Sequence, residues 1–223
     1  MIRGSVIALA VLLMLLPAGC DQADGGDSQG ESLSKLPAPD TTGGMTLAAA
    51  LNQRRSIRSF ASTPLTSTQV GQLLWAGQGI TDGSNRKTAP SAGALYPLTL
   101  LHADASGIYR YDPAGHAQTL VRSGDHRSVL AAAALGQDSV EQAPSVIAIA
   151  GRESITAVKY GSRAERYMKL EAGHAAQNVL LQATALGLGA VPVGAFDDAD
   201  VGEVLGLSGG ETSLYLIPVG VPR

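Results

Sequence analysis

The protein has 223 residues, enough for one domain and an appendage, and 45% of them are hydrophobic, which suffices for a core. A formal net charge of −3 leaves no dominant basic surface, so nucleic acid is not an expected partner. Cys20 is the only cysteine, and the four histidines lack ligand spacing such as H-x-x-x-H, so we expect neither a disulfide framework nor a metal site.

Residues 1–20 have the features of an export signal. Arg3 supplies the positive charge, and residues 6–16 are apolar but too few for a membrane-spanning helix, which needs about 20. Small residues precede Cys20 as in a bacterial lipobox, in which the cysteine is lipidated; the alternative is an ordinary cleaved signal peptide with an incidental cysteine. We therefore predict an exported protein that a lipid on Cys20 anchors to the bacterial cell envelope, with Asp21 favouring the inner membrane.

Residues 21–44 are rich in Gly, Asp, Ser and Pro. Such a composition cannot bury enough apolar surface to offset the entropy lost on ordering, so it predicts a flexible linker. The folded domain is then expected to span residues 45–223.

A predicted helix over residues 45–53 leads into the sequence RRSIRSF at residues 54–60. Three arginines lie within five residues there, and no Asp or Glu occurs in residues 41–81. Guanidinium groups bind phosphate oxygens in a bidentate manner, and Ser56 adds a hydroxyl donor. The residues alone are compatible with a phosphate site and with a solvated basic helix end.

A capping-box pattern at residues 66–69 predicts a helix that ends near Gly77 or Gly79. The following sequence RKTAPSAGA, residues 86–94, is a predicted loop whose small residues would let the backbone approach a flat ring; an ordinary tight turn is the alternative. Strands are predicted at residues 98–102, 107–111, 118–122 and 145–150, and a helix at residues 127–135.

The stretch from residue 171 to residue 196 predicts a long helix, a glycine-rich stop and an extended segment. Its small apolar residues fall on one side of the helix: Ala172, Ala175, Ala176, Val179, Leu180, Ala183 and Leu186. Its polar residues fall on the other side: Glu171, His174, Asn178 and Gln182. An alanine stripe permits close approach of another backbone, as in a central or interface helix. A short helix from residue 197 and a strand at residues 214–218 complete the chain.

Three stretches, residues 54–60, 89–97 and 173–196, resemble the FMN-dependent nitroreductase superfamily in their sequence and order. In detail they resemble its branch of SagB-type dehydrogenases, which oxidise azolines to thiazoles and oxazoles. The resemblance covers roughly residues 45–221. It implies an α+β, nitroreductase-like three-layer fold, with a mixed sheet of four or five strands flanked by helices, and a homodimer with two FMN sites at its interface.

The resemblance also assigns site residues. Those expected to bind FMN are Arg54, Arg55, Ser56 and Arg58 for the phosphate and ribityl chain, Arg86, Pro90, Ser91, Ala92 and Gly93 in the loop, Val193, Gly194 and Ala195 near flavin N5, and Arg223 at the phosphate. Asn178 is assigned either to the cofactor or to a neighbouring strand. Lys159 and Tyr160 resemble a Lys-Tyr pair that transfers protons in the azoline-oxidising relatives; the alternative is a surface lysine beside a packing tyrosine.

These assignments predict an FMN-dependent oxidoreductase that passes hydride through flavin N5, to or from an unidentified small or peptide-borne substrate. NADH and NADPH are the candidate electron donors. The alternatives are a flavin-binding or sensing lipoprotein without turnover, and a solute-binding lipoprotein without flavin.

Overall fold

The structure is a computed structural model that describes Met1 and residues 33–223. The predicted signal peptide, its lipidation residue Cys20 and residues 21–32 of the predicted linker lie outside the described residues, apart from Met1 itself. Among the helices that are described, none is both long and apolar enough to span a bilayer.

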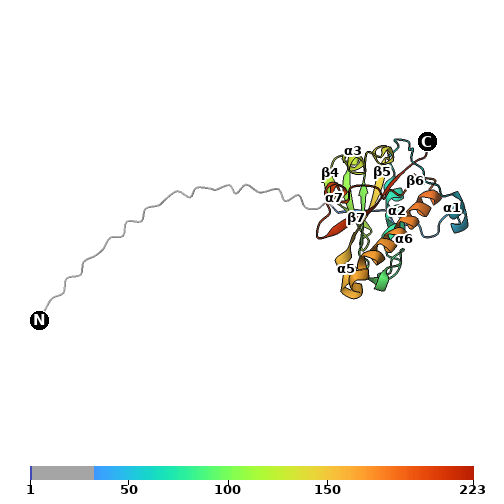
Figure 1. The fold of residues 1–223 in the computed structure, drawn as a ribbon. Helices are drawn as coiled ribbons and strands as arrows, with labels where there is room; N and C mark the ends of the chain where they lie inside the picture. Colours follow the sequence, from blue (N-terminus) through green and yellow to red (C-terminus); the bar gives the residue numbers. More distant parts are fainter. Residues whose placement is uncertain (2–32) are drawn as a thin grey trace. The chain divides into compact units, whose positions relative to one another are not determined.

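Within residues 33–223, one antiparallel sheet of seven strands runs through the middle of the fold, in the order β1-β4-β3-β2-β5-β7-β6 (Figure 1). The strands are β1 (Leu33–Lys35), β2 (Leu98–Ala103), β3 (Gly107–Asp112), β4 (Ala117–Ser123), β5 (Ser145–Arg152), β6 (Gly189–Ala190) and β7 (Glu211–Gly220). All five predicted strands are confirmed. The predictions of four or five strands and of a mixed sheet are wrong, because β1 and β6 are too short to show an alternating pattern and every named pair is antiparallel.

Helices cover both faces of the sheet and make three layers. Alternate residues of β5 show this division: Ile147 and Ile149 pack toward α2 and α6, whereas Val146 and Ala148 pack toward α3, α4 and α7. The helices are α1 (Leu47–Gln53), α2 (Ser67–Gln78), α3 (Arg127–Ala133), α4 (Asp138–Glu141), α5 (Glu153–Tyr160), α6 (Ala164–Ala185) and α7 (Asp198–Val204). Two short 3-10 helices are η1 (Ala92–Ala94) and η2 (Gly161–Arg163).

Helix α6 is the long helix that the sequence predicts, and it begins seven residues earlier than expected. Its alanine-rich stripe is buried against the sheet and α2, as the periodicity predicts. Glu171 differs from its prediction, because it is buried rather than exposed. It lies beside the stripe residues Ala172 and Ala175, and the predicted loop covers it near Ser91.

The part of the predicted linker that the structure describes packs on the domain. Strand β1 pairs with the edge of β4, and Leu36 is buried. The backbone N–H of Asp40 donates to Gln72 Oε1 at 2.8 Å, and Gln72 Nε2 donates to the carbonyl of Asp40 at 3.0 Å. Residues 33–44 therefore belong to the folded unit, because a few backbone bonds and one buried leucine suffice to hold a polar segment on a sheet edge.

Candidate functional site

The arginine-rich segment lies against the glycine-bounded segment that follows α6. Ser56 forms a parallel bridge with Ala190, and the N–H of Ile57 donates to the carbonyl of Ala190 at 3.1 Å. Gly189 permits this approach, because a Cβ on it would lie 2.7 Å from the Cβ of Ile57. Two stretches more than 130 residues apart in sequence are thus joined through their backbones.

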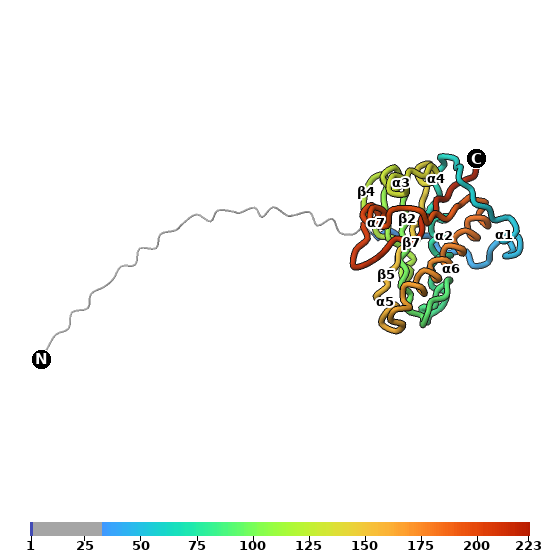
Figure 2. Tube along the Cα trace, in the orientation of Figure 1, coloured from blue at the N-terminus to red at the C-terminus, as the bar shows by residue number. Residues whose placement is uncertain are grey.

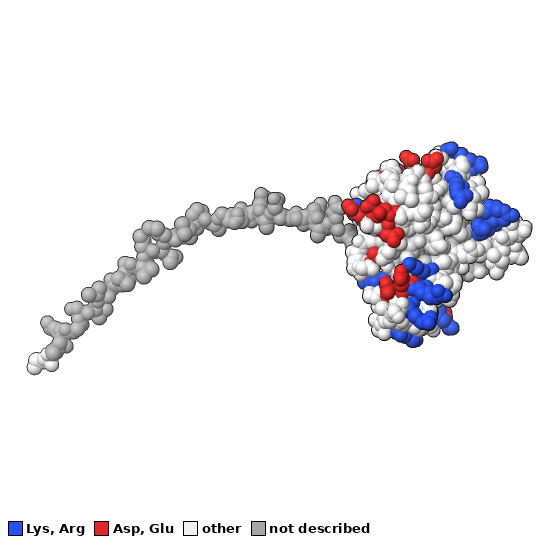
Figure 3. Space-filling model, viewed as in Figure 1, with Lys and Arg blue, Asp and Glu red and all other residues white. Residues whose placement is uncertain are grey.

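The end of the chain joins the same segment. Phe60 bridges Pro222, the N–H of Ala61 donates to the carbonyl of Val221 at 2.8 Å, and the N–H of Arg223 donates to the carbonyl of Ser59 at 3.2 Å. Figure 3 shows Lys and Arg side chains gathered on the surface near α1 and the C terminus, whereas Asp and Glu gather near α7. The backbone of Arg223 therefore lies beside the arginine-rich segment, and its contact with a phosphate stays a prediction.

A cavity of about 500 Å³ opens beside this basic segment. Arg58 and Ser59 line it, together with Gly136 and Gln137 of the turn before α4 and with Asp138, Ser139 and Gln142 of α4 and its C-terminal end. Gln137 Nε2 donates to the carbonyl of Ala195 at 2.7 Å, which ties this turn to the predicted flavin N5 segment. Sequence reasoning missed Gln137, since nothing in a polar turn distinguishes it from other surface amides.

The N5 segment itself is held on the sheet by a pair of backbone bonds. The N–H of Val193 donates to the carbonyl of Leu216 at 2.7 Å, and the N–H of Leu216 donates back at 3.0 Å. Val193 is buried, while Gly194 and Ala195 are exposed. Residues 54–60 and Arg223 therefore form one half-site of the candidate centre, and residues 193–195 reach from it toward the start of α6, where Gly194 lines a cavity with Glu165.

The predicted loop runs along α6 and meets the predicted catalytic pair. Asn178 Nδ2 donates to the carbonyl of Thr88 at 3.2 Å, so its partner in this structure is the loop rather than a strand. Further along, a Cβ on Gly93 would lie 3.0 Å from both Lys159 Nζ and Tyr160 Oη, and Gly93 has φ +64°. A side chain at this position would be strained by the backbone conformation and would crowd the ends of the Lys159 and Tyr160 side chains.

Arg86 stands apart from the other predicted loop residues. Its Nε lies 2.6 Å from Asp82 Oδ2, and its side chain is largely exposed. Pro90 is exposed and Ala92 is half-buried. Arg86 is therefore held by an acid of its own loop.

The two half-sites lie at opposite ends of α6 within one protomer. Tyr160 precedes α6 by only the three residues of η2, whereas Leu47 and Ala50 of α1 line a cavity with Gln182 near the end of α6. A helix of 22 residues at 1.5 Å per residue spans about 30 Å. Figures 1 and 2 show α5 at one end of this helix and α1 at the other. A single protomer therefore does not bring the arginine segment and the Lys-Tyr pair together.

Comparison with known proteins places this fold in a family. The model of the nitroreductase family matches residues 51–221. The chain belongs to the nitroreductase family.

Relatives of this nitroreductase-family chain are similar to it in sequence, in fold or in both. It is 42% identical over 176 residues to "Putative nitroreductase MJ1384" of Methanocaldococcus jannaschii, which covers 76% of this chain and 88% of that protein. The crystal structure of "a putative nitroreductase" from Ralstonia eutropha JMP134 has a TM-score of 0.78 at 31% identity, and the match covers 86% of this chain and 90% of the other. The NADPH:FMN oxidoreductase of Vibrio harveyi complexed with NAD+ has a TM-score of 0.61 at 24% identity, covering 79% and 69%, and shows likeness of fold. In general terms, the family indicates a flavin-dependent oxidoreductase.

Beneath the loop of this nitroreductase-family chain lies a buried acid that sequence reasoning placed on the wrong side of α6. Glu171 is 3% exposed, and its Oε1 has no hydrogen-bond partner among the described residues. Burial raises the pKa of Glu171 to about 7, against the opposing effects of the Ser91 hydroxyl and the Lys87 ammonium. The Ser91 hydroxyl accepts the N–H of Tyr96 at 2.9 Å, which leaves its own proton to donate toward Glu171.

Lys87 completes this cluster from the other end of the loop. Burial lowers the pKa of Lys87, and the charge of Glu171 opposes that effect. Its Nζ lies 5.0 Å from the centre of the Tyr96 ring, and its backbone N–H donates to Tyr96 Oη at 3.3 Å. Glu171, Ser91, Tyr96 and Lys87 thus fix the loop on α6.

Replacing Glu171 by glutamine should make stability less dependent on pH between about pH 5 and pH 8. An acid whose folded pKa is raised keeps its proton in the folded chain, so the free energy of unfolding falls as the pH rises from 4.5 to about 7. The free energy of unfolding of E171Q, measured relative to that of the wild type, should therefore be about 2 kcal/mol higher at pH 8.5 than at pH 5. Urea unfolding at the two pH values measures this, with the exposed Glu203→Gln as the matched control. Equal pH dependence in E171Q and wild type would contradict the prediction.

Proposed function

We propose that the protein is an FMN-dependent oxidoreductase of nitroreductase type that transfers hydride to or from a small or peptide-borne substrate. The observation that carries this proposal is the convergence of three segments, residues 54–60, 189–195 and 221–223, beside the cavity that Arg58 lines. A nucleotide with an anionic phosphate and a polar ring edge needs cations at one end and amide donors at the other.

The residues present fit such a cofactor. Arg54, Arg55 and Arg223 would hold the phosphate, and Ser56 would donate to it or to the ribityl chain. Arg58 offers a guanidinium donor in the cavity beside residues 193–195, whereas Gln137 Nε2 already donates to the carbonyls of Ala134 and Ala195. When bound, FMN supplies reversible hydride transfer through its ring, while the chain supplies binding, orientation and electrostatics.

Lys159 and Tyr160 are proposed to move the proton that accompanies hydride transfer. Lys159 is exposed, and Tyr160 is half-buried with its ring edge-on to Tyr167 at 5.0 Å between centres. The two polar atoms converge on Gly93, so both face the same point of the loop. A tyrosine hydroxyl beside an ammonium group can donate or accept a proton at a substrate atom. This pair also supports the proposed relation to the SagB-type branch.

A homodimer would join the two half-sites. Because they lie toward opposite ends of α6, a twofold axis that packs two α6 helices antiparallel would place the Lys-Tyr pair of one copy beside the arginine segment of the other. The exposed side of α6 carries Leu170, which an antiparallel partner would cover.

We also propose that the protein is exported and lipidated on Cys20, at the outer side of a bacterial cell membrane. This location is supported by the sequence of residues 1–20 alone. Metabolic labelling with a fatty acid, compared between wild type and Cys20→Ala, tests it: labelling should be lost in the variant, and labelling of both would contradict the proposal.

Spectra of the purified protein test the function. We expect bound FMN with a flavin absorption band, reduced by NADH or NADPH without oxygen. Arg58→Ala should weaken FMN binding by at least about tenfold, because a charge-assisted bond is lost, whereas the exposed Arg122→Ala on β4 should bind normally. Flavin that is bound but never reduced by any donor would favour the sensing alternative. A colourless protein that takes up no FMN would contradict the proposal.

A further inference from the structure

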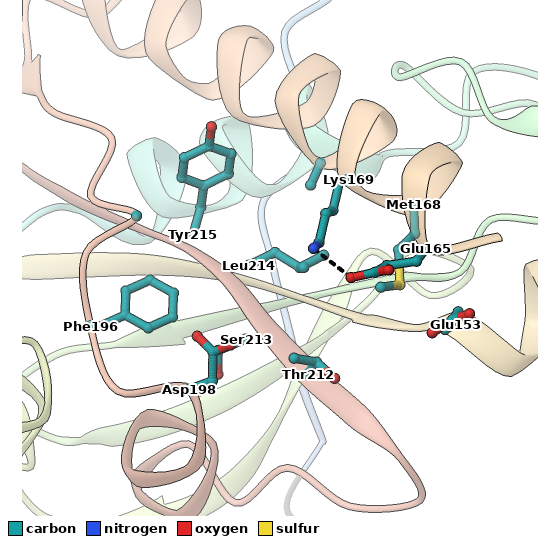
Figure 4. A pocket seen from close by; sticks show the side chains of 12 residues that line it. Glu153, Glu165, Met168, Lys169, Phe196, Asp198, Thr212, Ser213, Leu214 and Tyr215 are labelled. Atoms are coloured by element: carbon teal, nitrogen blue, oxygen red, sulfur yellow. Dashed lines mark hydrogen bonds and ion pairs between the residues drawn. The ribbon is translucent and has the colours of Figure 1, made fainter. Parts of the chain in front are cut away.

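A second cavity, of about 400 Å³, lies between the first half of α6, the segment after Gly194 and the start of β7 (Figure 4). Its deepest residues are Met168, Ala172 and Ser213, all buried. Phe196, Leu214 and Tyr215 add apolar surface, with the Tyr215 ring on the α6 side of β7 and the Phe196 ring on the segment that follows Gly194. The cavity therefore has an apolar floor.

Carboxylates surround the mouth of this cavity. Glu153, Glu165 and Asp198 line it together with one cation, Lys169, and all four are exposed. Lys169 Nζ pairs with Glu165 Oε1 at 2.6 Å, and within residues 33–223 neither Glu153 nor Asp198 has an ion pair. The lining thus carries two more negative than positive charges.

All three acids affect the pKa of Lys169. The hydrogen bond and charge of Glu165 raise the pKa of Lys169, and the charges of Asp198 and Glu153 raise it further. Lys169 satisfies Glu165 and leaves the other two carboxylates to attract a second cation.

Ser213 provides an independent sign of a ligand. It is 3% exposed and lines the cavity, yet its Oγ has no hydrogen-bond partner among the described residues. A buried hydroxyl without a partner is costly, so a donor or acceptor is expected to reach it from the cavity. Strand β7 is paired on one side only at this residue, because β6 covers just its far end, so the sheet edge is open here.

We propose that this cavity binds an organic cation, an ammonium or guanidinium group joined to an apolar or aromatic body. The apolar body would lie on Met168 and Leu214 between the Phe196 and Tyr215 rings, whose faces attract cations. The charged group would lie toward Asp198 and reach the Ser213 hydroxyl. Because Gly194 also lines the cavity, such a ligand would touch the segment assigned to flavin N5; its role as substrate, but not its binding, rests on the proposed function.

Titration with three probes of similar size and different charge tests the proposal. Benzylamine, which is a cation at neutral pH, should bind the purified protein with a Kd of about 1 mM or lower, as seen by saturation-transfer NMR. Benzyl alcohol and benzoate should bind at least about fivefold more weakly, and of the three probes only benzylamine should lose affinity when salt is added. Equal binding of all three probes, or no binding of benzylamine at about 10 mM, would overturn the proposal.

Asp198→Asn and its matched control locate the site. Asp198 and Asp200 are both exposed residues of α7, but only Asp198 lines the cavity. D198N should weaken benzylamine binding about fivefold and D200N should not change it, while S213A should weaken it to a smaller degree. Equal effects of D198N and D200N would place the cation elsewhere and refute the site.

The two proposals fail separately. A yellow, reducible protein that does not bind benzylamine would refute the cation site and leave the oxidoreductase intact. A colourless protein that binds benzylamine through Asp198 would refute the flavin function and leave the site intact.

Discussion

Replacing Glu211 by glutamine should lower the free energy of unfolding by about 3 kcal/mol at neutral pH, because it breaks a buried ion pair. Glu211 Oε1 lies 2.7 Å from Arg110 Nη1, Oε2 lies 2.8 Å from Arg110 Nη2, and the Thr99 hydroxyl donates to Oε1 at 2.8 Å. The Glu211 side chain is 3% exposed. Its loss leaves the Arg110 guanidinium, which is one-third exposed, without its carboxylate.

The pH dependence of this loss has a definite sign. Burial alone would raise the pKa of Glu211, but the hydrogen bonds from Arg110 and Thr99 and the charge of Arg110 outweigh it and lower the pKa to about 2. An acid whose pKa is lowered by folding stabilises the fold at pH values above its ordinary pKa of 4.5, and this contribution is lost as the pH falls toward 2. The difference between wild type and E211Q should therefore shrink between about pH 4.5 and pH 2.

Urea unfolding at pH 7 and near pH 3 measures both effects. Glu165→Gln is the control, because its pair with Lys169 is similarly short at 2.6 Å but more than half exposed, and exposed pairs contribute little to stability. A loss in E211Q as small as that in E165Q, or a loss that does not change with pH, would show that the pair does not stabilise β7 on β2 and β3.

The parts of the fold that the sequence predicts are those with local causes. The capping box of Thr66 and Gln69 begins α2 as expected, with both reciprocal bonds present, and Gly79 ends it. The stripe of α6 is buried because its period matches the helix. Each of these features depends on residues within a few positions of one another.

The parts that the sequence does not predict depend on distant partners. Strand β6 has two residues and exists because β7 pairs with it. Glu171 is buried because the loop with Ser91 covers that part of α6. The sequence pattern of α6 carries no information about that loop, which lies far away in the sequence. Gln137 holds residues 193–195 through its bond to the carbonyl of Ala195, and these two residues meet only in the folded chain. The motifs thus supplied the predicted site residues, whereas the placement of these residues toward the two ends of α6 required the fold.

That division leads to the second large prediction, which concerns mixtures of two inactive variants. Arg58→Ala should bind FMN at least about tenfold more weakly and be inactive when FMN is limiting. Lys159→Met should keep FMN but lose turnover by about 100-fold, as removal of a general acid or base does. If each site combines Arg58 of one copy with Lys159 of the other, a mixed dimer has one intact site and one doubly altered site. Unfolding and refolding the two variants together should then restore about a quarter of the wild-type activity, since about half the dimers are mixed.

A site contained in one copy gives the opposite result, because every protomer in the mixed dimer then carries an altered site. Mixing Lys159→Met with Tyr160→Phe is the matched control, since both residues belong to the same half-site and no pairing of these chains restores it. Recovery in the first mixture and none in the second would assign the two ends of α6 to one composite centre. No recovery in the first mixture, with mixed dimers present by mass spectrometry, would refute the twofold arrangement and require the Lys-Tyr pair to act apart from the arginine segment.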